Sequence, residues 1–78
     1  MEHEIILKDE LDEFIRLGQA LKAAHLCMSG GEAKEMIAEG RVRVNDEVEV
    51  RRGRKLHDGD RVLCGEDVIV IRQAGHEN

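Results

Sequence analysis

Residues 29–45 read SGGEAKEMIAEGRVRVN and predict a helix that passes directly into a strand. Ser29 and Glu32 have the spacing of a capping box, in which a hydroxyl and a carboxylate satisfy free N–H groups at a helix start. Gly40 supplies a stop, because glycine adopts the left-handed conformation without a steric penalty. We therefore expect a helix over about 30–39. Its buried stripe consists of Ala33, Met36 and Ile37.

The overlapping segment RVRVNDEVEV alternates between valine and polar residues and predicts a β-hairpin. A two-residue turn would pair Val44 with Glu47 and mix valines with glutamates on one face. A turn formed by the three residues NDE pairs Val44 with Val48 and places Arg43 opposite Glu49 on the outer side. We expect this second register, because it keeps every valine on the buried face. These valines are Val42, Val44, Val48 and Val50.

Four apolar residues upstream have the i, i+3, i+4, i+7 spacing of one helix face and predict a helix over about 17–26. They are Leu17, Ala20, Leu21 and Ala24. Because only a few residues separate this helix from the next, we expect the two to pack as a compact pair. The apolar residues 4–7 predict a short strand. Residues 13–17 fit either a second strand or the beginning of the helix.

The downstream part of the chain reads as turn and strand. HDGD at 57–60 has the composition of a turn, and residues 61–64 and 68–71 predict short strands around Gly65. Residues 73–78 form a polar tail. The fold class expected from these elements is α+β, with two short helices packed on a small, mainly antiparallel sheet that includes a hairpin.

The composition is that of one small folded domain. The chain has 78 residues, contains no Pro, Trp or Tyr, and has Phe14 as its one aromatic residue. We expect this ring to lie in a core that is otherwise aliphatic. No segment approaches the ~20 apolar residues that cross a bilayer, and the acidic start MEHEIILKDELDE is unlike a targeting peptide. These features favour a cytoplasmic, monomeric protein with no membrane partner.

The two cysteines, Cys27 and Cys64, are expected to be free thiols in a cytosolic protein. A disulfide, or a zinc site that includes His25, stays open as the alternative. Structural zinc usually takes four ligands in closely spaced pairs, and nothing near Cys64 supplies a second pair. We therefore expect no metal and no cofactor.

Positive charge is concentrated in one part of an acidic chain. The formal net charge is −5, yet residues 41–61 carry seven Lys or Arg against five Asp or Glu. The stretch RRGRK supplies four of these cations. A local excess of this kind is typical either of a surface for a polyanion or of a solvated loop. The start of the second helix adds to it, because free N–H groups and the helix dipole favour a phosphate near SGGE.

The segments SGGEAK, EGRVRVN, RRGRKL and DGD, in this order, resemble the S-four-type RNA-binding domain, and in particular its small stand-alone bacterial members. The resemblance implies one domain over residues 1–78, with a core motif at about 14–64 of the type called alpha-L. One departure is visible: the hairpin turn, usually Asn-Gly in this family, is Asn45–Asp46 here. This departure bears only on turn geometry, because Asp tolerates positive φ better than most residues.

The resemblance also implies a function and a site. The function is non-catalytic binding of structured RNA, either ribosomal or tRNA-like, without a small-molecule substrate. The RNA face carried over by position consists of Ser29, Gly30, Gly31, Lys34, Arg41, Asn45, Arg51, Arg52, Arg54 and Lys55. Single-strand modules stack bases on aromatic rings, and this chain has one ring, expected outside the basic region. We therefore expect phosphate and shape contacts instead.

Two other readings of the basic stretch stay open. It fits an interaction module that docks an acidic protein partner, and the same face fits DNA. An enzyme is not expected, because the four histidines are scattered and no nucleophile–base pair or phosphate-binding GKS/T loop is present.

Overall fold

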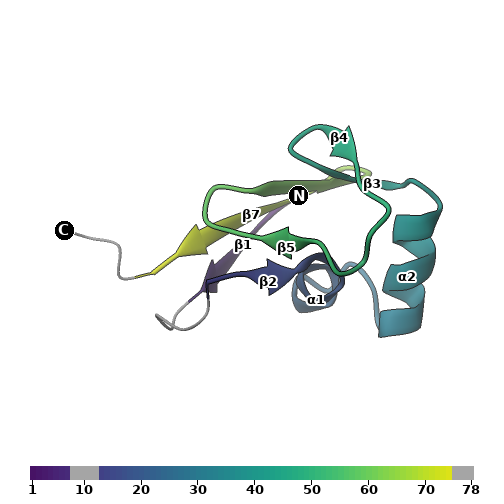
Figure 1. The fold of residues 1–78 in the computed structure, drawn as a ribbon, viewed down its shortest axis with the longest axis horizontal. Helices are drawn as coiled ribbons and strands as arrows, with labels where there is room; N and C mark the ends of the chain where they lie inside the picture. The colour runs from purple at the N-terminus through teal and green to yellow at the C-terminus, as the bar shows by residue number, and fades with distance from the viewer. Residues whose placement is uncertain (8–12, 75–78) are drawn as a thin grey trace.

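A computed structural model describes residues 1–7 and 13–74 of the chain. It has the expected α+β architecture, with two helices packed on a five-stranded sheet and a separate two-stranded sheet beside the first helix (Figure 1). The elements in chain order are β1 (Glu2–Leu7), β2 (Ile15–Arg16), α1 (Leu17–Ala23), α2 (Gly30–Ala38), β3 (Val42–Val44), β4 (Glu47–Val48), β5 (Lys55–Leu56), β6 (Arg61–Cys64) and β7 (Asp67–Gln73).

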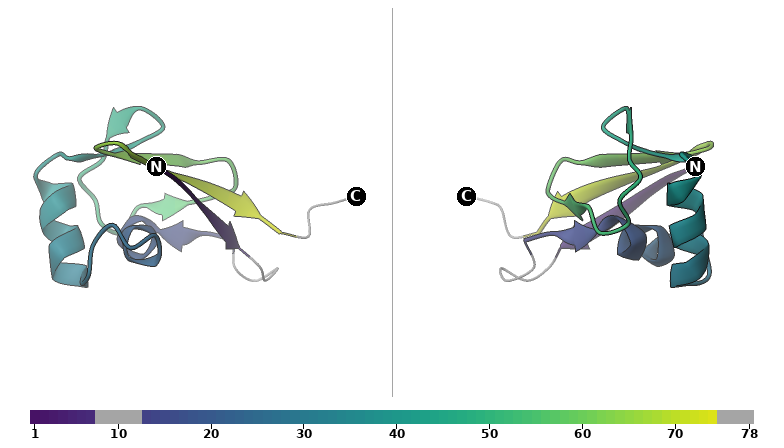
Figure 2. Two further views of the ribbon diagram at one scale, coloured as in Figure 1. Left: turned by 180° about the vertical axis from the view of Figure 1, so that it is seen from behind. Right: turned by 45° about the vertical axis from the view of Figure 1, so that its right-hand side comes forward.

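The large sheet is mixed, with strand order β1-β7-β6-β3-β4. Every pairing in it is antiparallel except that of β1 with β7, which is parallel. Both helices lie on one side of this sheet (Figure 2). The segment at 13–17, left open by the sequence, is a short strand that pairs with β5 and then enters α1 at once. The last strand is longer than expected and includes Gln73, the first residue of the predicted tail; residues 75–78 lie outside the described part.

Aliphatic side chains from both helices and the sheet form the core. The stripe predicted for α2 is buried, and Ile37 at its centre is 1% exposed. Leu17 and Leu21 of α1 meet it from the other helix, while Val42 and Ile69 close it from the sheet. With no large aromatic ring in this cluster, the domain depends on close packing of branched aliphatic groups.

Both helices end in the same way. The N–H of Leu26 donates to the carbonyl oxygen of Leu21, and His25, at φ 62°, takes the left-handed conformation. This is a Schellman motif, which stops α1 three residues before the predicted end at 26. Gly40 does the same for α2 at φ 77°, as the sequence predicted.

The start of α2 is the predicted cap with one difference. The hydroxyl of Ser29 accepts a hydrogen bond of 3.1 Å from the N–H of Glu32. The carboxylate of Glu32 reaches back to the N–H of Met28, at 2.6 Å, rather than to that of Ser29.

The predicted hairpin register is wrong. The turn has two residues, Asn45 and Asp46, both with positive φ, and it pairs Val44 with Glu47. Such a turn matches the natural twist of paired strands, and Asn and Asp tolerate its positive φ values. As a consequence Val48 and Val50 point outward, at 52% and 60% exposure, instead of joining the core.

The side chain that takes the inward place is Glu49, which is 6% exposed. It does not face Arg43, as the other register required; Arg43 lies opposite Val48. The N–H of Glu49 donates to the carbonyl oxygen of Val42, which extends the hairpin by one rung. A buried carboxylate needs compensating charge. That charge comes from the basic stretch.

Candidate nucleic-acid interface

The basic loop, residues 51–55, is fastened to the first turn of α1. The N–H of Leu17 donates to the carbonyl oxygen of Arg54 at 2.8 Å, and the N–H of Gly18 donates to that of Arg52 at 3.0 Å. First-turn N–H groups have no acceptor within their own helix. The loop therefore completes the helix start, and the helix in turn fixes the loop.

A cation that the sequence reading missed, Arg16, adds two further ties. It pairs with Lys55 between β2 and β5, and its guanidinium donates to the carbonyl oxygen of Gly53 at 3.0 Å. Its own N–H donates to the side chain of Gln19 at 3.1 Å. Arg16 is far from the basic loop in sequence, and only the β2–β5 pairing brings the two together.

Glu49 holds two of the four loop cations. Its carboxylate accepts hydrogen bonds from Nε of Arg51 at 2.9 Å and from Nη1 of Arg54 at 2.9 Å. The N–H of Arg51 donates to the same carboxylate at 3.0 Å. The hydrogen bonds from Arg51 and then Arg54 lower the pKa of Glu49 from its ordinary value of 4.5 to about 2, against the opposing effect of burial.

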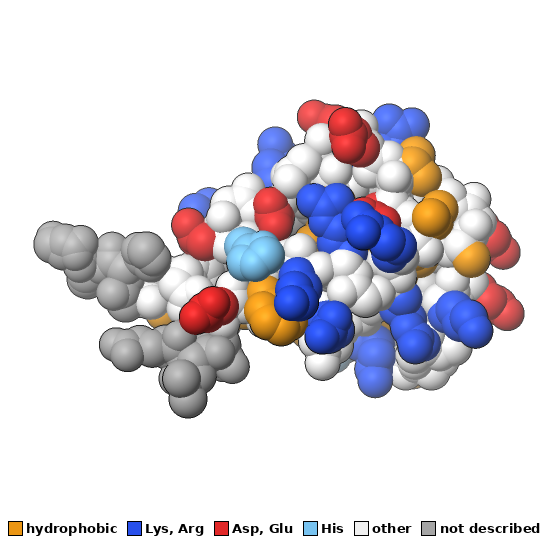
Figure 3. Space-filling model, in the orientation of Figure 1, with side chains coloured by type: hydrophobic (Ala, Val, Ile, Leu, Met, Phe, Trp, Pro, Cys, Tyr) orange, Lys and Arg blue, Asp and Glu red, His pale blue; other side chains and the backbone are white. Residues whose placement is uncertain are grey.

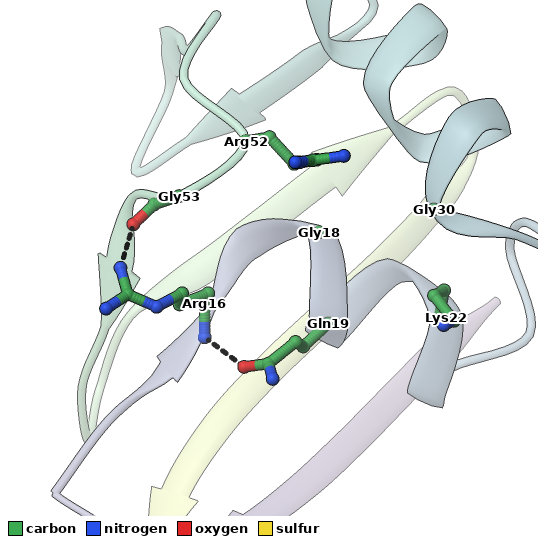
Figure 4. A pocket seen from close by; sticks show the side chains of 7 residues that line it. All are labelled: Arg16, Gly18, Gln19, Lys22, Gly30, Arg52 and Gly53. Carbon is green, nitrogen blue, oxygen red and sulfur yellow. Dashed lines mark hydrogen bonds between the residues drawn. The ribbon is translucent and has the colours of Figure 1, made fainter.

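Two hollows flank Gly53 on this face. One has a volume of about 340 Å³ and lies between the basic loop, α1 and the start of α2 (Figure 4). Its lining consists of three cations, Arg16, Lys22 and Arg52, together with Gly18, Gln19, Gly30 and Gly53. The other hollow is lined by Arg51, Gly53, Arg54 and Lys55.

These six Lys and Arg residues form a continuous basic face, which Figure 3 shows as a group of cationic side chains on one side of the molecule. We define the basic face as Arg16, Lys22, Arg51, Arg52, Arg54 and Lys55. Only one buried carboxylate, Glu49, is bonded to it within residues 1–7 and 13–74. An ordered surface of this charge attracts a polyanion such as a phosphate backbone.

Comparison with known proteins identifies the family of the chain. The family model of the S4 domain matches residues 9–72. The chain belongs to the S4 domain family, an RNA-binding family. A Bacillus subtilis (strain 168) protein described as "Probable ribosome maturation protein RlbA" is 56% identical over 48 residues, which cover 62% of this chain and 68% of that protein.

In this S4 domain Phe14 lies within the basic region, which corrects the prediction of a core position outside it. The ring is half-buried. Nζ of Lys55 stands 4.8 Å from the ring centroid, and Cζ of Arg16 stands 5.4 Å from it. The ring of His57 lies 6.2 Å away, centroid to centroid. Cation–π contacts of this kind hold the two basic side chains in place.

The remaining predicted site residues are spread more widely. Gly30 lines the hollow beside Arg52, whereas Ser29 is occupied as the helix cap. Gly31 and Lys34 are exposed on α2. Arg41 lies apart, in a hollow with Cys64 and Asp67.

Asn45 has a structural task in the S4 domain. Its amide donates to Asp60 at 3.0 Å, and its side-chain oxygen accepts from the N–H of Arg61 at 3.0 Å. These bonds join the hairpin turn to the beginning of β6. The side chain has few hydrogen-bonding positions left for RNA.

Both cysteines are free thiols, with Cys27 buried and Cys64 half-buried. Burial raises the pKa of each thiol above its ordinary value of 9.0. In the part of the chain that the structure describes, no cluster of three His, Cys, Asp or Glu side chains is arranged to hold a metal ion. In the same part, no helix has the length and apolar character to cross a membrane.

Proposed function

We propose that this S4 domain binds structured RNA through the basic face, by phosphate and shape contacts and without a catalytic step. The observation that carries the proposal is the construction of the basic loop. Its carbonyl oxygens are bonded to α1, and two of its guanidinium groups are bonded to Glu49. A loop that is already ordered loses less conformational entropy on binding than a solvated one.

The chemistry of the face favours folded RNA over single strands. Arginine supplies a planar fork of donors that fits phosphate oxygens, and five such donors are present on each of four arginines. The one aromatic ring of the chain, Phe14, has Lys55 and Arg16 near it. Because cations compete for this ring, stacking of successive bases contributes little, and recognition rests on backbone geometry.

The RNA we propose is ribosomal. The support is the Bacillus subtilis relative, whose description names ribosome maturation. A domain of this size presents a small interface, so we propose that it acts as a monomer on one local element of folded RNA. A tRNA-like element offers the same backbone geometry and is the second RNA to test. A ribosomal target would place the protein in the cytoplasm.

Crosslinking in cells followed by sequencing of the attached RNA identifies the target directly. The expected result is enrichment of one or a few sites in ribosomal RNA, lost in a variant with Arg52→Ala. The charge-matched control is Arg72→Ala, since Arg72 lies on β7 in an ion pair with Glu4, outside the basic face. Reads spread evenly over all RNA, or unchanged by Arg52→Ala, would contradict the proposal.

Competition in vitro separates RNA from the rival partners. A labelled ribosomal RNA fragment is bound by the purified protein, and unlabelled tRNA, duplex DNA or an acidic polypeptide is added at equal charge. We expect folded RNA to compete best. Duplex DNA or the polypeptide competing equally well would show that the face recognises charge alone.

A further inference from the structure

We infer that the hollow between the basic loop, α1 and the start of α2 is a seat for a single phosphate group of the bound RNA, an inference that rests on the proposed function. This inference assigns different tasks to two parts of the basic face. Arg51 and Arg54 form ion pairs with Glu49 and hold the loop. The hollow contains three other cations of the face, while Lys55 lines the neighbouring hollow.

Among the described residues, no carboxylate pairs with the cations of this hollow. Arg16, Lys22 and Arg52 line it, and none of the three has an ion pair with a carboxylate within residues 1–7 and 13–74. Three cations around one cavity repel one another, so an anion placed among them is favoured. The neighbouring hollow differs, because two of its cations already share a buried carboxylate.

Glycine at position 18 sets the direction of Arg52. A Cβ at this position would lie 2.7 Å from Cγ and 3.2 Å from Cδ of Arg52, so the side chain rests directly on the helix backbone. Its guanidinium extends from there over α1 toward Gly30 (Figure 4). Lys22 follows Gly18 by four residues and therefore lies on the same face of α1. Arg52 and Lys22 thus border the same hollow.

The walls leave room for a phosphate and its ester oxygens. At about 30 Å³ per water molecule, a volume of about 340 Å³ holds on the order of ten waters. A Cβ added at Gly30 would meet no atom within 4 Å, so this wall is open space beside backbone. Arg16 closes the opposite rim, where its bond to the carbonyl oxygen of Gly53 fixes it at 3.0 Å. A planar fork and a point charge around such a space are typical of phosphate sites.

The first experiment uses inorganic phosphate and pyrophosphate as probes, followed by amide NMR at constant ionic strength with chloride as the balancing anion. We expect saturable shifts confined to Gly18, Gly30 and Gly53, with tighter binding of pyrophosphate. Lys22→Ala and Arg52→Ala should each weaken this binding about tenfold, the loss expected for a charged hydrogen bond. Arg72→Ala should leave it unchanged. Shifts spread over the surface, or shifts equal for phosphate and chloride, would overturn the inference.

A second variant tests geometry with every charge kept. Gly18→Ala should displace Arg52 and weaken pyrophosphate binding, while Lys22→Ala provides an independent measure that does not alter the loop contact. Titration of the same variants with a folded ribosomal RNA fragment distinguishes this inference from the proposed function. RNA binding that depends on the basic face, without localised phosphate binding, refutes the seat alone. Localised phosphate binding without affinity for folded RNA refutes the proposed function.

Discussion

Nη1 of Arg54 donates a hydrogen bond of 2.9 Å to Oε1 of Glu49, a carboxylate that the hairpin turns toward the interior. The bond joins the end of the hairpin to the basic loop. This bond gives a reason for burying an acidic residue beside the basic face. Glu49 lowers the net charge there, but it fixes the positions of Arg51 and Arg54.

Replacing Glu49 by Gln distinguishes the effect of loop order on RNA binding from the effect of net charge. The variant gains one positive charge, so electrostatics alone would tighten RNA binding. We expect weaker binding of folded RNA instead, because Arg51 and Arg54 are released, together with a loss of about 1–3 kcal/mol in the free energy of unfolding. Glu47→Gln makes the same charge change at an exposed neighbour and is the control. Equal or tighter binding by Glu49→Gln would show that the loop needs no such anchor.

The stability of the domain should depend on pH through Glu49. Its pKa is about 2 in the folded state, against an ordinary value of 4.5. A group whose folded pKa is lowered stabilises the fold above its unfolded pKa, and that contribution is lost as the pH falls through the folded pKa. Urea unfolding should therefore show a decline between about pH 4.5 and 2 that is smaller in Glu49→Gln. Identical pH profiles would remove Glu49 as its source.

The hairpin register can be tested by truncation. Ile37→Ala removes a core side chain that is 1% exposed and should lower the free energy of unfolding by about 2–5 kcal/mol. Val50→Ala, at an outward position, should change it by less than about 0.5 kcal/mol. Both changes in the free energy of unfolding are measured by urea titration. The comparison requires that the variants share the wild-type m value, the slope of that free energy against urea concentration. A large loss of stability in Val50→Ala would contradict the outward position of Val50 and support the register that buries all four valines.

The cysteines should be unreactive in the folded protein. Burial raises the pKa of both thiols, so little thiolate is present at neutral pH. We expect slow modification by a thiol reagent, two titratable thiols after unfolding, and no stoichiometric zinc in the purified protein. Fewer than two thiols, or unfolding on chelation, would contradict this assignment.

Local chemistry in the sequence was enough to predict the helices and most strands. The cap at Ser29 and the stop at Gly40 depend on bonds within a few residues, and both were predicted. The end of α1 was missed, because His25 takes the left-handed conformation without being glycine.

The hairpin register failed for a different reason. The valine pattern favoured one answer, but the buried place went to Glu49, whose charge is compensated by arginines beyond the hairpin. The hollow was also beyond local reasoning, since β2–β5 pairing and the turn of α1 bring Arg16 and Lys22 to the loop. The one signal in the sequence for Arg16 was its position immediately before a helix start.

The most direct test of RNA binding by the basic face is the salt dependence of affinity for one folded ribosomal RNA fragment. Arg52→Ala with Lys55→Ala should weaken binding and reduce the slope of log affinity against log salt by about one to two units, because two phosphate contacts are lost. Arg54 is left intact, since it also holds Glu49. The control, Arg43→Ala with Arg72→Ala, removes two charges elsewhere and should keep the slope. Superimposable lines for wild type and the first variant, with both proteins equally folded, would contradict the account.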